Sequence, residues 1–170
     1  MSKDITKSLF HFILIALFQV FVLNQIHLFG LINPLIYIWF IILLPINTKN
    51  WVVLISSFAI GLAIDVFEGQ IGFHSLVTVF MGFIRPVFIS IFFNNKETDE
   101  LTRPSISQMG IARFVPFIFI FIFIHHFLYF TLEIFTFSEF FLTLLRILLS
   151  SITTSILIVL LDLLFIRRRD

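Results

Sequence analysis

The sequence contains no cysteine and few charged side chains. The absence of cysteine excludes disulfides, thiolate nucleophiles and the zinc sites that depend on sulfur ligands. Charged residues make up 12% of the chain, whereas a soluble domain usually carries about 25%. The net charge of +1 provides no strongly basic surface, so we expect no nucleic-acid partner. These absences point away from a soluble domain and toward a membrane protein.

Apolar residues take the place of the missing charges. They make up 59% of the 170 residues, phenylalanine alone occurs 26 times, and the mean hydropathy is +1.11. A helix that crosses a bilayer needs about 20 largely apolar residues. We therefore predict an all-α integral membrane protein, with residues 1–170 forming a single six-helix transmembrane domain. The predicted helices span about residues 9–28, 31–45, 51–67, 71–93, 111–135 and 140–166.

The second predicted span, residues 31–45, is the weakest of the six. It is short, begins near Pro34 and stops at Pro45. Proline favours helix ends, because its ring clashes with the preceding turn. We expect this span to pair with the third as a tight hairpin around residues 47–50.

Lysine and arginine fall in alternate loops of the predicted bundle. The loops around residues 24–33, 68–70 and 133–139 contain neither. Cytoplasmic loops of membrane proteins are enriched in these cations, so the pattern predicts cytoplasmic termini and an even number of spans. The cations that define the pattern are Lys3, Lys7, Lys49, Lys96, Arg103, Arg113, Arg167, Arg168 and Arg169.

Small and polar residues recur at helical spacing in four predicted helices, so each set shares one helix face. Two interpretations stay open: these faces pack together inside the bundle, or they line a cavity or a protein-docking surface. The first face comprises Ser57, Gly61, Asp65 and Glu68. The others are Ser75, Thr78, Gly82 and Arg85; His126, Tyr129 and Glu133; and Thr143, Arg146, Ser150 and Thr153.

Two arginines lie within predicted spans, where an ionised side chain costs about 2.5–3.5 kcal/mol. We predict that Arg146 forms an ion pair with an acid near the same depth. Arg85 either extends to the lipid headgroups or meets Asp162. The acids within reach of Arg146 are Asp65, Glu68 and Glu133.

The turn after the third predicted span contains Gly69 and Gly72, which favour a tight chain reversal. His74 follows as a helix-start residue. The adjacent His125 and His126 point to different sides of a helix, so they cannot chelate one metal ion.

No catalytic motif of a metalloprotease, an α/β-hydrolase or a phosphate-binding loop is present. The spacing Gly61-x-x-x-Asp65 matches a fragment of the membrane phosphatidyltransferase motif. That motif needs further aspartates at helical spacing, and the next such position is Gly69. We therefore expect no enzyme, no cofactor and no metal.

The order and spacing of several motifs in residues 18–86 resemble the bacterial rod shape-determining MreD family, in a Bacteroidetes-type form. Residues 111–166 resemble it only in length, hydropathy and a basic end. The motifs are Phe18-Gln19 to Asn24, Phe29-Gly30 to Asn33-Pro34, Leu44-Pro45, Gly61-Leu62-x-x-Asp65-x-Phe67-x-Gly69-x-x-Gly72-x-His74 and Arg85-Pro86.

The resemblance implies a non-enzymatic subunit of the cell-elongation machinery in the bacterial inner membrane. MreD-like proteins partner the single-span protein MreC and, through it, MreB filaments and peptidoglycan synthases. Whether the protein also forms a homodimer is left undecided by the resemblance. The family's fold is similar to the six-helix substrate-binding components of energy-coupling-factor vitamin transporters, which makes a vitamin-type binding component the alternative function.

The hairpin over residues 61–86 is the expected partner surface, with Asp65 and Arg85 as orienting charges. On this interpretation, Asp65→Ala weakens partner binding more than it lowers protein level. Arg146→Glu is expected to abolish folding, because it places like charges together.

Overall fold

The computed structural model describes residues 2–25, 30–70, 72–93, 101–134 and 140–166, and this part of the chain is helical without strands. The longer helices are α1 (Ser2–Phe21), α3 (Asn50–Glu68), α4 (Phe73–Phe92), α7 (Ile111–Ile134) and α8 (Phe140–Ile166). The short ones are the 3-10 turns η1 (Leu23–Gln25) and η2 (Ile36–Ile38) and the helices α2 (Trp39–Leu43) and α6 (Ile106–Met109).

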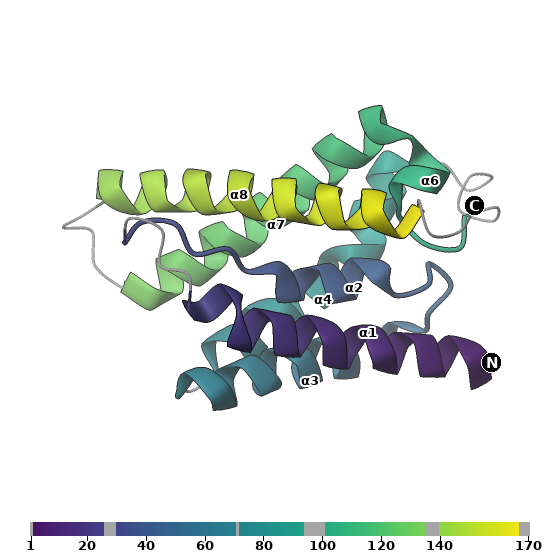
Figure 1. Cartoon of the computed structure of the whole chain (residues 1–170), viewed down its shortest axis with the longest axis horizontal. Coiled ribbons are helices and arrows are strands. Elements are labelled where there is room, and N and C mark those ends of the chain that lie inside the picture. Colours follow the sequence, from purple (N-terminus) through teal and green to yellow (C-terminus); the bar gives the residue numbers. More distant parts are fainter. Residues whose placement is uncertain (1, 26–29, 71, 94–100, 135–139, 167–170) are drawn as a thin grey trace.

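The helices run back and forth along the long axis of the molecule (Figure 1). The start of α1 and the end of α8 lie at the same end. The turn from α3 to α4, the end of α7 and the start of α8 lie at the opposite end. The arrangement is that of an elongated helical bundle.

Five helices among the described residues are long and apolar enough to cross a membrane. Large apolar side chains also cover the outside of the bundle: Phe141 is 83% exposed, Ile91 72% and Phe83 70%. Contiguous apolar surface of this kind is unfavourable in water and favourable in lipid. The described structure is therefore all-helical and compatible with that of a multi-pass membrane protein.

Four of the predicted spans match observed helices closely, namely α3, α4, α7 and α8. The first prediction was wrong at its start, because α1 begins at Ser2 rather than near residue 9. Hydropathy marks only the apolar part of a helix, and no glycine or proline interrupts the polar turn before it. Residues 26–28 and 135, where the first and fifth predicted spans end, lie outside the described residues, as do Lys96 and Arg167 to Arg169.

The second predicted span is not a continuous helix. Residues 33–35 carry no regular structure, and helical backbone begins only with η2 and continues into the 5-residue α2. The physical reason is Pro34, which disfavours helical angles in the residue before it. Every residue from 34 to 44 is nevertheless buried, so the segment with the weakest hydropathy signal forms the centre of the bundle.

Side chains from α1 and α8 satisfy the non-helical backbone of this central segment. Gln19 Oε1 accepts the N–H groups of Ile36 (2.7 Å) and Tyr37 (3.3 Å), and Gln19 Nε2 donates to the carbonyl of Pro34 (3.0 Å). The hydroxyl of Thr154 accepts the N–H of Leu35 at 3.2 Å. Irregular backbone at membrane depth requires such protein partners, because lipid offers none.

The α3–α4 pair is the closest helix contact in the bundle. A Cβ added at Gly61 would stand 2.5 Å from the Cα and 2.7 Å from the backbone nitrogen of Ser75. One added at Gly82 would stand 3.1 Å from the Cβ of Ser57. The small residues thus let the two helices approach each other. Of the two interpretations left open by the sequence, packing inside the bundle accounts for this face.

Candidate functional site

A chain of hydrogen-bonded side chains runs through the interior near the α3–α4 turn. Gln19 Nε2 donates to Asn24 Oδ1 at 2.7 Å, and Asn24 Nδ2 donates to Glu68 Oε1 at 2.6 Å. Glu68 Oε2 lies 2.8 Å from His74 Nε2. We call this the buried polar chain; its members are Gln19, Asn24, Glu68, His74, Tyr37 and His125.

Tyr37, from the central segment, joins the helices at the far end of this chain. Its hydroxyl lies 2.7 Å from His74 Nδ1 and 2.9 Å from His125 Nε2. All three side chains are fully buried. The ring of His74 also stacks on Tyr129, with centroids 4.5 Å apart. The central segment is therefore pinned to α4 and α7 by one hydroxyl group.

One assignment of protons satisfies every link. Glu68 accepts from His74 Nε2–H, and His74 Nδ1 then accepts from the Tyr37 hydroxyl. The oxygen of Tyr37 in turn accepts from His125 Nε2–H. The Nδ1 atom of His125 is left without a hydrogen-bond partner in the described part of the chain.

Asp65, which the sequence singled out, is 1% exposed and holds the start of α4. Its two carboxylate oxygens accept the backbone N–H groups of His74 and Ser75, each at 2.9 Å, and one also accepts the Ser75 hydroxyl. The residue in the N-cap position of α4 is Gly72, which has no side chain to do this. Asp65 therefore caps α4 from α3, in place of a local N-cap side chain.

The two turn glycines adopt left-handed backbone angles, as the sequence predicts for a tight reversal. Gly69 has φ 68° and its N–H bonds to the Asp65 carbonyl, which ends α3. Gly72 has φ 81° where α4 begins. Both positions suit glycine because a Cβ disfavours this region. They shape the turn that brings Asp65 over the first turn of α4.

Arg146 forms its expected ion pair with Glu133. The Arg146 Nη1 to Glu133 Oε2 distance is 3.7 Å, and the side chains are 33% and 35% exposed. The guanidinium also lies 5.5 Å from the ring centroid of Phe130 and donates to the Gly30 carbonyl at 3.4 Å. The pair links α7 to α8 at the rim of the bundle.

We expect the substitution Arg146→Glu to lower the free energy of unfolding by only about 1 kcal/mol, because partly exposed ion pairs contribute little. This replaces the sequence-based expectation that the same substitution abolishes folding. The double swap Arg146→Glu with Glu133→Arg should recover most of the loss. Thermal unfolding in detergent, followed by size-exclusion chromatography, measures both. Complete loss of the folded peak in the single variant would contradict this estimate.

Both interpretations offered for Arg85 from sequence were wrong. Arg85 is 2% exposed, and its Nη2 donates to the carbonyl of Leu44 and, at 3.3 Å, to that of Pro45. These carbonyls follow the short α2, whose last turn leaves them without helical partners. Asp162 instead accepts the N–H of Ile106 at 2.7 Å. Arg85 therefore anchors the end of the central segment rather than reaching headgroups.

The buried polar chain opens toward one end of the molecule only. Glu68 is 19% exposed, whereas His125 is fully buried. Beyond His125, the inward face of α7 continues with apolar side chains that are at most 1% exposed: Ile122, Phe121, Ile118, Phe117 and Phe114. No group of three or more potential metal ligands occurs among the described residues. The buried polar chain can hold the helices together and share protons among its own members, but its hydrogen bonds do not form a path across the bundle.

We expect Tyr37→Phe to destabilise the protein by about 2 kcal/mol, because it strands His74 Nδ1 and His125 Nε2 in the core. A double-mutant cycle with His125→Leu isolates the Tyr37–His125 link, and its coupling energy should be about 1 kcal/mol. Thermal or denaturant unfolding of the four proteins in one detergent supplies the cycle. A coupling near zero would show that the link contributes nothing.

The sequence interpretation missed Gln19, Asn24, Tyr37 and His125 as members of the site. Gln19 and Tyr37 are isolated polar side chains inside long apolar runs, and His125 lies in such a run beside His126; that is the signal that could have found these three. On α8, the sequence-predicted stripe is only partly correct. Ser150 is buried and its hydroxyl accepts the N–H of Asn33 at 3.0 Å, whereas Thr153 bonds to its own helix at Leu149.

Ser57, another of the predicted site residues, is buried against Gly82, and its hydroxyl donates to the Val53 carbonyl at 2.7 Å. Gly61, Asp65, Glu68, Gly69, Gly72 and His74 gather at the α3–α4 hairpin, Arg85 anchors the end of the central segment, and the Glu133–Arg146 pair joins α7 to α8. No protein-family model, curated protein or solved structure matches the chain.

Proposed function

We propose that this protein is a non-enzymatic membrane subunit of the bacterial cell-elongation machinery, similar to MreD, and that it binds an MreC-like single-span membrane protein. Through that partner it acts with MreB filaments and peptidoglycan synthases. The protein works as a scaffold, so its function lies in presenting a stable membrane surface and not in chemistry at a pocket.

The proposal rests on the hydrogen bonds that join residues from different motifs of the MreD resemblance. Gln19 and Asn24 come from the first motif, Pro34 from the second and His74 from the fourth. Direct hydrogen bonds join Gln19 to Asn24 and Pro34, and Glu68, at an unspecified position of the fourth motif, bonds to both Asn24 and His74. Leu44 and Arg85, from two further motifs, also bond to each other. The motifs therefore act as one structural unit, which supports treating their order and spacing as a family signature.

The proposed membrane placement has six crossings with both termini in the cytoplasm of a bacterial inner membrane. Residues 31–35 at about 3.3 Å each, followed by η2 and α2 at about 1.5–2.0 Å per residue, reach about 30 Å. This matches the thickness of the hydrocarbon core of a bilayer. The central segment thus counts as a crossing although most of it is not α-helix.

The alternative, a vitamin-binding component of an energy-coupling-factor transporter, needs polar side chains of α4, α7 and α8 around an open cavity. Those side chains are engaged with the central segment: His74 and His125 bond to Tyr37, and Thr154 bonds to the backbone of Leu35. The space between these helices is therefore occupied by the chain itself. This observation favours the scaffold over the transporter.

The test is affinity purification of the full chain from its native membrane in mild detergent. We expect a stoichiometric single-span membrane protein to co-purify, and depletion of the chain to turn rod-shaped cells round. A retained vitamin-like small molecule without such a partner would support the transporter instead. Rod shape that persists after depletion would refute the proposed function.

The small-residue face of the α3–α4 hairpin is not the partner surface in this proposal. Gly61 and Gly82 face the opposing helix, and Asp65 and Arg85 are buried at 1% and 2% exposure. A partner therefore binds an outer face of the bundle. An alanine scan of exposed side chains on α4 and α8, read out by co-purification, would locate it.

A further inference from the structure

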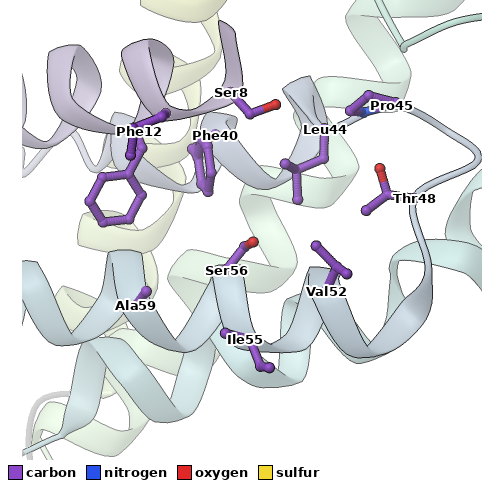
Figure 2. Close-up of a pocket in the computed structure, with 11 residues that line it drawn as sticks. Ser8, Phe12, Phe40, Leu44, Pro45, Thr48, Val52, Ile55, Ser56 and Ala59 are labelled. Atoms are coloured by element: carbon purple, nitrogen blue, oxygen red, sulfur yellow. The ribbon is translucent and has the colours of Figure 1, made fainter. Parts of the chain in front are cut away.

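An open groove of about 470 Å³ lies between α1, α3 and the end of the central segment. It is distinct from the buried polar chain, since the two share no residue. Figure 2 shows Ser56 and Val52 of α3 pointing toward Phe40 and Leu44 across the groove. Its lining is Ser8, Leu9, Phe12, Phe40, Leu44, Pro45, Thr48, Val52, Ile55, Ser56 and Ala59.

The groove is lined mainly by apolar side chains, and its hydroxyl groups come from Ser8, Thr48 and Ser56. Thr48 and Pro45 lie at the end near the start of α3, whereas Phe12 and Ala59 lie at the opposite end (Figure 2). Two exposed cations are next in sequence to hydroxyl-bearing lining residues, Lys7 before Ser8 and Lys49 after Thr48. Lys49 also stands at the N-terminus of α3, where the helix dipole is positive.

We propose that this groove binds one acyl chain of an anionic phospholipid, whose phosphate is held by Lys7 and Lys49. The apolar lining matches the hydrocarbon, and the cations match the headgroup charge. The volume lies in the range of small-molecule sites, roughly 300–1,000 Å³. The lipid belongs to the leaflet on the side of the α1 N-terminus.

Lipid bound there extends the packing of α1, the least buried of the five membrane-length helices in the described part of the chain. Only 28% of the α1 span is buried within the bundle, compared with 44% of the α4 span. A chain seated between α1 and α3 contacts both helices and the end of the central segment. The groove is therefore a lipid site that joins α1 to the rest of the protein.

Native mass spectrometry of the detergent-solubilised full chain tests the proposal, with dioleoyl phosphatidylglycerol and dioleoyl phosphatidylcholine added separately. We expect one phosphatidylglycerol to bind more tightly than phosphatidylcholine. The double variant Lys7→Gln with Lys49→Gln should reduce that preference, by about fivefold per lysine. Lys7→Arg with Lys49→Arg should retain it, because the charge is unchanged.

A second variant tests the apolar part of the site. Ser56→Phe fills the groove and should weaken binding of both lipids at least about tenfold, a loss of about 1.4 kcal/mol. Ser90→Phe places the same change at an exposed position of α4 outside the groove and should have no effect. If Ser56→Phe does not fold, the lysine variants still decide the question of charge.

Equal binding of the two lipids by the unmodified protein would overturn the proposal, as would unchanged binding in a folded Ser56→Phe variant. If Ser56→Phe instead removes a co-purifying membrane protein while lipid binding persists, the groove is a helix-docking site. These outcomes are independent of the cell-shape experiment, so either proposal can fail alone.

Discussion

Replacing Asp65 with alanine will lower the free energy of unfolding by about 4 kcal/mol and greatly reduce the amount of folded protein in the membrane. The substitution removes the acceptor for the N–H groups of His74 and Ser75 and for the Ser75 hydroxyl. Hydrogen bonds to charged groups contribute about 1.5–3 kcal/mol each. Asp65 is 1% exposed, so water does not replace the lost acceptor.

The matched control is Asp65→Asn, which keeps the shape and one accepting oxygen. It should lose about half as much stability as the alanine variant. Fluorescence-detected size-exclusion chromatography after heating measures both, and membrane fractions measure accumulation. The sequence interpretation expected the opposite order, with partner binding affected more than protein level. Normal accumulation of Asp65→Ala with loss of the partner would restore that interpretation.

Replacing Gly61 with alanine is the second large effect. The new Cβ would stand 2.5 Å from the Cα of Ser75, and backbone cannot move aside as a side chain can. The α3–α4 pair must separate, which also moves Asp65 away from the N–H groups that it caps. We expect a loss of about 3 kcal/mol, at the upper end of the usual range for overpacking.

Gly82→Ala is the control, because its new Cβ would meet the side chain of Ser57 rather than backbone. It should cost clearly less than Gly61→Ala, and adding Ser57→Ala should relieve part of the cost. Thermal unfolding midpoints of the three variants in the same detergent make the comparison. Equal losses at Gly61 and Gly82 would show that the distance to Ser75 does not govern the packing.

Some residues of the candidate site act through neighbours in the sequence, and others bond to residues far away in the sequence. Gly69 and Gly72 act locally, and their turn role follows from sequence because glycine tolerates positive φ. The partners of Glu68 and Arg85 lie 44 and 41 residues away, in Asn24 and Leu44. The depth of each residue along its predicted helix limited the possible partners of Arg146 to three acids. Depth alone did not identify Glu133 as the partner.

The sequence by itself determined the strongly apolar, helical character of the chain, the helices α3, α4, α7 and α8, and the face on which Ser57 and Gly61 lie. These follow from composition and from periodicity, both of which are local properties of the chain. Only the tertiary structure decided that residues 34–44 form the buried centre. Their backbone is held by Gln19 and by Thr154, the latter 119 residues from Leu35, and no local pattern encodes contacts over that separation.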